Sequence, residues 1–121
     1  MPCELIVEVN LQAVHSRYYG NVTLEDVLQQ RRQIAAHPDF DPEFALIIDF
    51  SDVTRIELSA ADIQTVARSA TPVNRLSRHL FVAPRPDMYG LARMYQAFGE
   101  DVHPKVLIVG TFDEAKQLLK T

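Results

Sequence analysis

The sequence predicts an α/β fold: a mixed five-stranded sheet with an N-terminal antiparallel hairpin, parallel core strands and about four helices. Polar and apolar residues alternate at the start of the chain, which is typical of a strand with one buried face. Later, short apolar runs are separated by amphipathic segments that begin with helix-capping residues, and this order favours parallel strands joined by crossover helices. The length of 121 residues and the hydrophobic content of 47% fit one domain over residues 1–121.

The first half of the chain contains the hairpin. Leu5 to Leu11 and Ala13 to Tyr19 are the two expected strands, although no Asn-Gly or Asp-Gly pair marks the turn between them. A helix is expected to begin at a loose capping box formed by Thr23 and Asp26 and to end near residue 37, before a proline. The run from Phe44 to Phe50 is apolar except for one acid, as expected for a parallel strand that helices cover on both faces.

The second half of the chain continues the alternation of capped helices and short apolar strands. The expected elements are a helix from Ser59 to Thr71, a strand from His79 to Ala83, a helix from Asp87 to Phe98, a strand from Lys105 to Val109 and a helix opened by Thr111. Ser59 and Thr111 are each followed three residues later by an acid, which is the signature of a capping box.

Charge and composition exclude several classes of protein. The net charge of −4 argues against nucleic-acid binding, because such a chain gains little from phosphate contacts. One cysteine, Cys3, cannot form an intramolecular disulfide, and no leader-like start or apolar run near 20 residues is present. We therefore expect a cytoplasmic protein without a transmembrane segment. Residues 63–98 carry five arginines against one acid. Scattered solvated charges explain this excess, and so does a surface for an anionic ligand, an acidic partner or an anionic lipid.

A family resemblance covers nearly the whole chain. Residues 46–63 read Leu-Ile-Ile-Asp-Phe-Ser-Asp-Val-Thr-Arg-Ile-Glu-Leu-Ser-Ala-Ala-Asp-Ile. This segment resembles the central segment of STAS domains, the fold of anti-sigma-factor antagonists. Three further features are similar to a SpoIIAA-like bacterial family mostly of unknown function: the early hairpin, the segment Gly90 to Tyr95 (Gly-Leu-Ala-Arg-Met-Tyr) and the segment Phe112 to Ala115. The resemblance implies a noncatalytic module for proteins or small ligands, and its wider fold neighbourhood includes lipid carriers of the CRAL-TRIO type.

The chain departs from that family at the phosphorylation site. In phosphoregulated members the first serine of a Ser-Ser pair takes the phosphate; alignment of Glu57 with the family aspartate places Leu58 there and leaves Ser59 as the second serine. Ala60 stands where the family has glycine. The resemblance therefore implies that the phosphate switch is lost, and we expect Ser59 to be a helix N-cap.

No motif for metal, nucleotide or acyl chemistry is present, so no catalytic residue, metal or cofactor is expected. The four histidines lie in different elements and are expected to be ordinary surface or strand residues. Asp49, Ser51 and Ser59 are candidates for a pocket at the end of the central strand, where open α/β sheets place their sites. Four acids are expected to gather there, namely Asp49, Asp52, Glu57 and Asp62. Capping and turn bonds explain them, and a small enzyme using them is a further alternative.

The helix from Asp87 to Phe98 has an apolar face of about 160°, wider than the about 100° needed to dock on a sheet. A buried core helix explains this width, and so does a helix that roofs an apolar pocket or forms a homodimer seam. The candidate ligand-binding residues are Arg85, Met88, Tyr89, Leu91, Met94, Tyr95 and Phe98.

The function that the sequence predicts is a noncatalytic binding module. It takes an apolar or amphipathic, lipid-like small molecule or makes peripheral contact with a membrane. The alternative is a protein–protein regulatory module that resembles anti-sigma-factor antagonists but lacks the usual phosphoserine.

Overall fold

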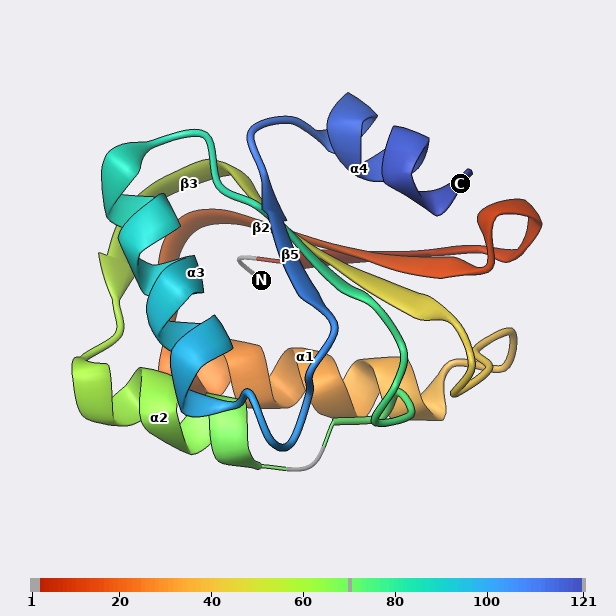
Figure 1. Cartoon of the computed structure of the whole chain (residues 1–121), viewed down its shortest axis with the longest axis horizontal. Coiled ribbons are helices and arrows are strands. Elements are labelled where there is room, and N and C mark those ends of the chain that lie inside the picture. The colour runs from red at the N-terminus through yellow and green to blue at the C-terminus, as the bar shows by residue number, and fades with distance from the viewer. Residues whose placement is uncertain (1–2, 70, 121) are drawn as a thin grey trace.

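The structure is a computed structural model that describes residues 3–69 and 71–120. Its elements are β1 (Cys3–Glu8), a 3-10 turn (Val9–Leu11), β2 (Ala13–Thr23), α1 (Leu24–Ala36), β3 (Ala45–Glu57), α2 (Ala60–Arg68), β4 (His79–Val82), α3 (Pro86–Phe98), β5 (Val106–Val109) and α4 (Phe112–Leu119). The strands lie in the order β1-β2-β3-β4-β5, with β1 antiparallel to β2 and the other pairs parallel (Figure 1). The predicted fold class is confirmed.

Helices cover the two faces of the sheet unequally. Three helical connections, β2–α1–β3, β3–α2–β4 and β4–α3–β5, each move the chain by one strand in the same direction across the sheet. Because such parallel crossovers are right-handed, α1, α2 and α3 all lie on one face. The helix α4 follows the last strand and, among the helices of the described residues, is the one that covers the other face (Figure 1). Successive side chains of β3 point to opposite faces of the sheet. Leu46 packs beneath α1, whereas Ala45 and Ile47 pack beneath α4.

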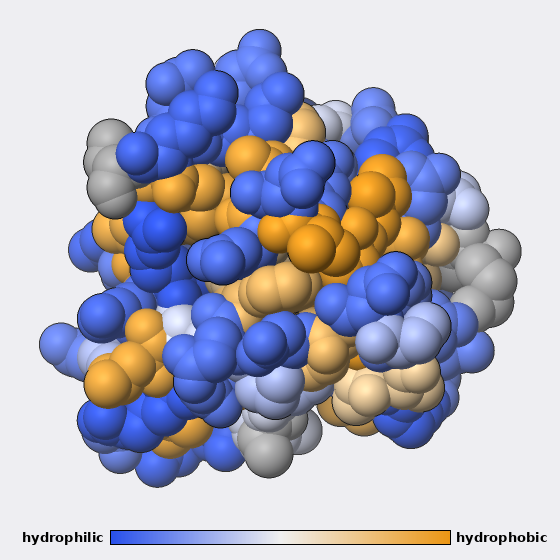
Figure 2. All heavy atoms as spheres, turned by 90° about the vertical axis from the view of Figure 1, so that its right-hand side faces the viewer, coloured by the Kyte–Doolittle hydropathy of each residue, from blue (hydrophilic) through white to orange (hydrophobic). Residues whose placement is uncertain are grey.

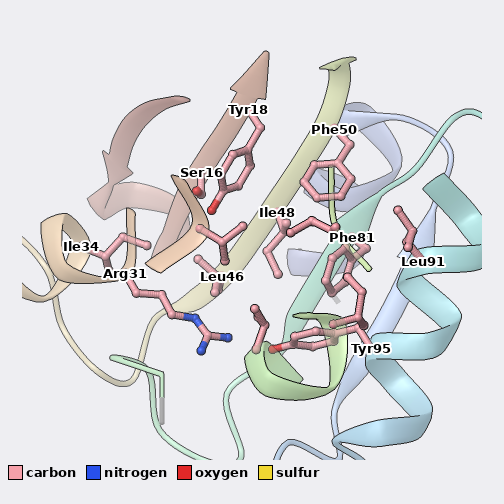
Figure 3. Close-up of a pocket in the computed structure, with 14 residues that line it drawn as sticks. Ser16, Tyr18, Arg31, Ile34, Leu46, Ile48, Phe50, Phe81, Leu91 and Tyr95 are labelled. Carbon is pink, nitrogen blue, oxygen red and sulfur yellow. The ribbon is translucent and has the colours of Figure 1, made fainter. Parts of the chain in front are cut away.

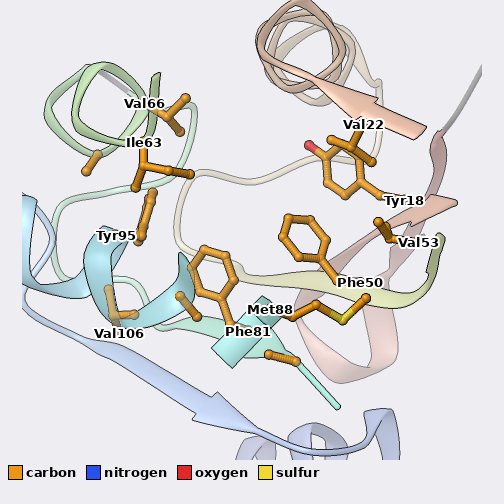
Figure 4. Close-up of a cluster of buried hydrophobic side chains, with 13 residues drawn as sticks. Tyr18, Val22, Phe50, Val53, Ile63, Val66, Phe81, Met88, Tyr95 and Val106 are labelled. Carbon is orange, nitrogen blue, oxygen red and sulfur yellow. The ribbon is translucent and has the colours of Figure 1, made fainter. Parts of the chain in front are cut away.

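The larger core lies between the sheet and α1, α2 and α3. Three of its aromatic rings come from adjacent strands, with Phe50 edge-on to both Tyr18 and Phe81, and Tyr95 comes from α3 (Figure 4). The helices α2 and α3 approach closely where α3 ends: a Cβ placed on Gly99 would lie 2.9 Å from the carbonyl oxygen of Ala67. Glycine is therefore needed at this contact for steric reasons.

The hairpin turn differs from the prediction. The alternation through Leu11 predicts a strand to that residue, but β1 ends at Glu8 and a 3-10 turn follows. Gln12 then takes a left-handed conformation, with φ of 51°, and its carbonyl oxygen accepts a hydrogen bond from the N–H of Ala45 at 2.9 Å. The turn thus reverses the chain without an Asn-Gly pair.

Two strands are longer than predicted. The apolar runs predict ends at Tyr19 and Phe50, whereas β2 and β3 continue, still paired in parallel, to Thr23 and Glu57. Cross-strand polar pairs explain the extension, because its exposed side chains bond each other. The guanidinium of Arg17 donates to Asp52 at 2.8 Å and the amide of Asn21 donates to Glu57 at 2.8 Å. Val22 and Val53 on the opposite face are buried.

The predicted helix starts are confirmed. Thr23 with Asp26 and Ser59 with Asp62 form complete capping boxes. The hydroxyl oxygen of Thr111 accepts a hydrogen bond from the backbone N–H of Glu114, as in a capping box. The carboxylate of Glu114, however, accepts from the hydroxyl of Thr111 and not from the backbone N–H of Thr111, so the predicted box is half-formed. Among the described residues, no helix has the length and apolar character needed to cross a bilayer.

Candidate functional site

An apolar pocket lies between the sheet and the layer of α1, α2 and α3 (Figure 3). Its floor is made by strands β2, β3 and β4, and its walls are made by the three helices and by Leu58 in the short connection before α2. The lining residues, in chain order, are Ser16, Tyr18, Val27, Arg31, Ile34, Leu46, Ile48, Phe50, Leu58, Ile63, Val66, Phe81, Leu91 and Tyr95. Ten of these are aliphatic or phenylalanine side chains, so the pocket favours an apolar occupant.

The pocket is a narrow slot that is partly open to solvent. Its volume is about 50 Å3, which is room for only a few water molecules. The space remains because α1 contacts α2 only sparsely, while α2 is held tightly against α3 at Gly99. A ligand larger than this volume therefore requires α1 to move away from α2.

One end of the pocket is polar. The guanidinium of Arg31 reaches into the slot toward the hydroxyl of Tyr95 (Figure 3), and its Nη1 donates to the Oγ of Ser69 at 2.8 Å. The Tyr95 hydroxyl lies 3.1 Å from Nδ1 of His79, whose ring stacks on His103 with centroids 4.8 Å apart. Polar side chains from α1, α3, β4 and two loops are therefore joined at one place in the core.

Burial keeps the ionisable groups beside Arg31 neutral at this polar end. Burial raises the pKa of Tyr95, and the nearby Arg31 only partly offsets that rise. Burial, with the charges of His103 and Arg31, lowers the pKa of His79 to about 3. Both groups are therefore neutral near pH 7, whereas arginine is always charged. No carboxylate is among the described residues that line the pocket, so its field favours an anionic group.

Arg31 is not among the residues predicted for a site, although the sequence carries a signal for it. Arg31 lies four residues after Val27 and three before Ile34, which places it on the apolar stripe of α1. A charged residue on the buried face of an amphipathic helix is a stronger indication of a site than the basic sector at residues 63–98. Ser16, Tyr18 and Phe81 carried no comparable signal, because only the sheet brings them to the pocket.

The structure brings two of the candidate residues on α3 to the pocket, namely Leu91 and Tyr95. Met88 is fully buried in the core, and Met94 and Phe98 are partly buried against it. The wide apolar face of α3 is thus largely used by the sheet and α2.

The remaining two candidates near the start of α3 lie elsewhere. Tyr89 is half exposed. Arg85 donates to the carbonyl oxygen of Val53 at 2.9 Å and pairs with Asp87. The other arginines of the basic sector are also engaged outside the pocket. Arg68 pairs with the carboxylate of Asp101, and Arg75 donates to the carbonyl oxygen of the same residue. Arg78 donates to a carbonyl oxygen and Arg93 to an amide oxygen.

The strand-end candidates lie apart from this pocket. On the α4 face, His15 Nε2 lies 2.7 Å from Asp49 Oδ2, and the N–H and hydroxyl of Ser51 donate to Asp49 Oδ1 at 2.9 and 2.6 Å. Burial raises the pKa of Asp49, but these hydrogen bonds outweigh it and the pKa lies below its usual value. The ring of His15 stacks on Phe112 of α4, with centroids 4.1 Å apart.

Ser59 lies beyond the far end of β3 and caps α2, as predicted. The four acids expected near one strand end are therefore spread along β3 and into α2. Asp52 and Glu57 are bonded across to β2, and Asp62 is held in the α2 capping box. This arrangement does not bring two carboxylates together for acid and base roles.

A second, more polar groove lies at the amino ends of β3 and β4, on the face that Figure 2 shows. Its lining alternates apolar residues, such as Leu11, Leu76 and Leu119, with the charged Glu43 and Lys105. Apolar side chains on this face are accordingly interrupted by hydrophilic ones in Figure 2. It lacks the continuous apolar lining of the pocket beneath α1, α2 and α3.

Comparisons with family models, with curated proteins and with solved structures gave no match for this chain. The resemblance to the SpoIIAA-like family and to STAS domains therefore stays a prediction.

Proposed function

We propose that this chain is a noncatalytic binding module that holds a slender amphipathic molecule of the fatty-acid type in the pocket beneath α1, α2 and α3. The observation that carries this proposal is one guanidinium, that of Arg31, in a lining that is otherwise mostly apolar. Burial of a hydrocarbon body contributes about 25 cal/mol of binding free energy per Å2 of apolar surface removed from water. A molecule with such a body and an anionic head satisfies both parts of the pocket.

The head group would lie at the polar end. A guanidinium carries five N–H donors in a planar fork, so Arg31 is able to bond Ser69 and a carboxylate together. The neutral hydroxyl of Tyr95 lies beside it as a further hydrogen-bonding group. The low polarity of the surrounding wall strengthens the attraction between guanidinium and carboxylate.

The hydrocarbon body would lie over Ile48, Phe50 and Phe81 and under Leu58 and Leu91. A single acyl chain needs a smaller separation of α1 from α2 than a bulky ring system does, so the pocket favours the acyl chain. Entry requires α1 to separate from α2, which the sparse contact between these helices permits. The roof is thus shared by three helices, of which α3 contributes only two residues.

Calorimetric titration with dodecanoate, below its micelle-forming concentration, tests this proposal. Arg31→Met keeps an apolar side chain but removes the charge, and we expect a loss of affinity of tenfold or more, as for a charge-assisted hydrogen bond. Arg32→Met is the matched control, because Arg32 is exposed on the same helix and pairs with Glu25. Its affinity should equal that of the wild type.

A second variant guards against a folding defect in Arg31→Met. Leu91→Trp enlarges a lining residue that is only partly buried, so the indole should fill the pocket and block dodecanoate, and a cooperative thermal unfolding transition would show that the variant is folded. Absence of dodecanoate binding to the wild type, or equal affinity in Arg31→Met, contradicts the proposal. The protein–protein regulatory alternative predicts that first result.

A further inference from the structure

The strand β5 forms an uncharged edge of the sheet. Within the described part of the chain, β4 is its only strand neighbour, and no other segment passes in front of it in Figure 1. Its residues, Val-Leu-Ile-Val, include no charge and no proline, and Leu107 is 41% exposed. Proteins usually protect such an edge, because its unpaired N–H and C=O groups recruit another strand.

The hydrogen-bond pattern shows which groups point outward. The N–H groups of His79 and Ala83 donate to the carbonyls of Lys105 and Val109, so alternate residues of β5 face β4. Val106 and Ile108 therefore direct their backbone groups away from the sheet. The side-chain amide of Gln96 donates to the carbonyl of Val106 at 2.8 Å, which confirms this direction.

We propose that β5 pairs with β5 of a second copy of this chain, antiparallel and centred on Leu107, to join two sheets into one. A two-fold axis through Leu107 sets Val106 opposite Ile108 of the partner, so the outward N–H and C=O groups of both residues bond in two symmetric pairs. The two Leu107 side chains meet at the axis, in the position where antiparallel neighbours come closest. Gln96 must release the Val106 carbonyl.

Charge complementarity supports a second copy as the partner. Lys105 lies two residues before Leu107, so its side chain projects to the α4 face. In the antiparallel register Lys105 lies opposite Val109 of the partner, just before the partner's α4, whose first turn carries Asp113 and Glu114. Asp113 pairs with Lys116 of its own helix at 3.4 Å but stays exposed, so its carboxylate can share a second cation. The two-fold axis repeats this attraction at both ends.

The other edge of the sheet disfavours such pairing. On β1, Glu4 and Glu8 flank Ile6 on one face, so an antiparallel copy would bring carboxylates of the same sign together. The contrast between a charged β1 and an uncharged β5 therefore assigns the interface to β5.

Sedimentation velocity over a concentration series tests the interface. We expect the wild type to reach twice the 13.7 kDa mass of the chain as concentration rises. Leu107→Lys places two ammonium groups at the axis and should leave only monomer. Val9→Lys is the matched control, because Val9 is 55% exposed beside the opposite edge of the sheet, and it should dimerise like the wild type.

Two further variants give results that a general loss of stability would not produce. Gln96→Ala removes the side chain that occupies the Val106 carbonyl, so it should strengthen the dimer. Lys105→Glu should weaken it, and Asp113→Lys added to Lys105→Glu should restore it. A wild type that stays monomeric up to millimolar concentration overturns the proposal, and so does a Leu107→Lys variant that dimerises normally.

Discussion

The hydroxyl of Tyr95 lies 3.1 Å from Nδ1 of His79, and this contact connects the lining of the pocket to a buried histidine pair. Tyr95 faces Arg31 on its pocket side, whereas His79 stacks on His103 on the other. Burial keeps His79 neutral by lowering its pKa to about 3, and the charges of His103 and Arg31 act in the same direction.

Mild acid should therefore destabilise the fold. The pKa of a histidine in an unfolded chain is about 6.5, so between that pH and the folded value of about 3 the unfolded state binds a proton that folded His79 does not. As the pH falls through this window, the free energy of unfolding should decrease by up to about 1.4 kcal/mol per pH unit. Above pH about 6.5, His79 should make no contribution to the pH dependence. Urea unfolding at a series of pH values measures the slope.

The variant His79→Leu should reduce that slope without abolishing it, because burial also lowers the pKa of His103. Titration of the histidine ring protons by NMR provides a check in the wild type. A His79 ring that titrates near its unfolded value would show that the group is accessible to protons and would remove this explanation.

Two glycines of the α3 region should respond oppositely to alanine. Gly99→Ala places a Cβ 2.9 Å from the carbonyl oxygen of Ala67, and this oxygen cannot move unless α2 moves with it. The substitution should therefore lower the free energy of unfolding by about 1–3 kcal/mol. Gly90→Ala, inside α3 with no atom near its Cβ, should stabilise by up to about 1 kcal/mol. Chemical denaturation of both variants measures the difference, and equal effects would contradict the close approach of α2 and α3.

The left-handed residue of the hairpin turn should show a side-chain preference. Gln12→Val should cost about 1–2 kcal/mol, because a β-branched side chain is disfavoured at φ of 51°. Gln12→Asn should be neutral or stabilising, since asparagine tolerates this conformation. Thermal unfolding of the pair tests the turn, and a Val variant as stable as the Asn variant would mean that the turn adopts another conformation.

Two aspartates of β3 should differ in their effect on stability. Asp49→Asn disturbs a buried group that bonds His15 and Ser51, and should cost about 1–3 kcal/mol. Asp52→Asn disturbs an exposed pair with Arg17 and should cost less than about 1 kcal/mol. Urea unfolding near neutral pH compares them, and equal costs would contradict the burial of the His15–Asp49 pair.

The sequence by itself determined the order and type of the elements, because those depend on local patterns. The capping pairs at Thr23 and Ser59 were predicted correctly, since a cap needs only residues three positions apart. The apolar run that begins β3 also identified a central parallel strand. Strand length was less predictable, because the extension of β3 to Glu57 depends on polar pairs with β2, more than thirty residues away.

Only the tertiary structure decided what the pocket contains. Arg31 meets Tyr95 because α1 and α3 lie on the same face of the sheet, and three crossovers of one hand place them there. The same packing turned most of the α3 apolar face into core and left two of its candidate residues, Leu91 and Tyr95, in the pocket. Such contacts join residues distant in sequence, and periodicity describes only the face of each element, not which element it meets.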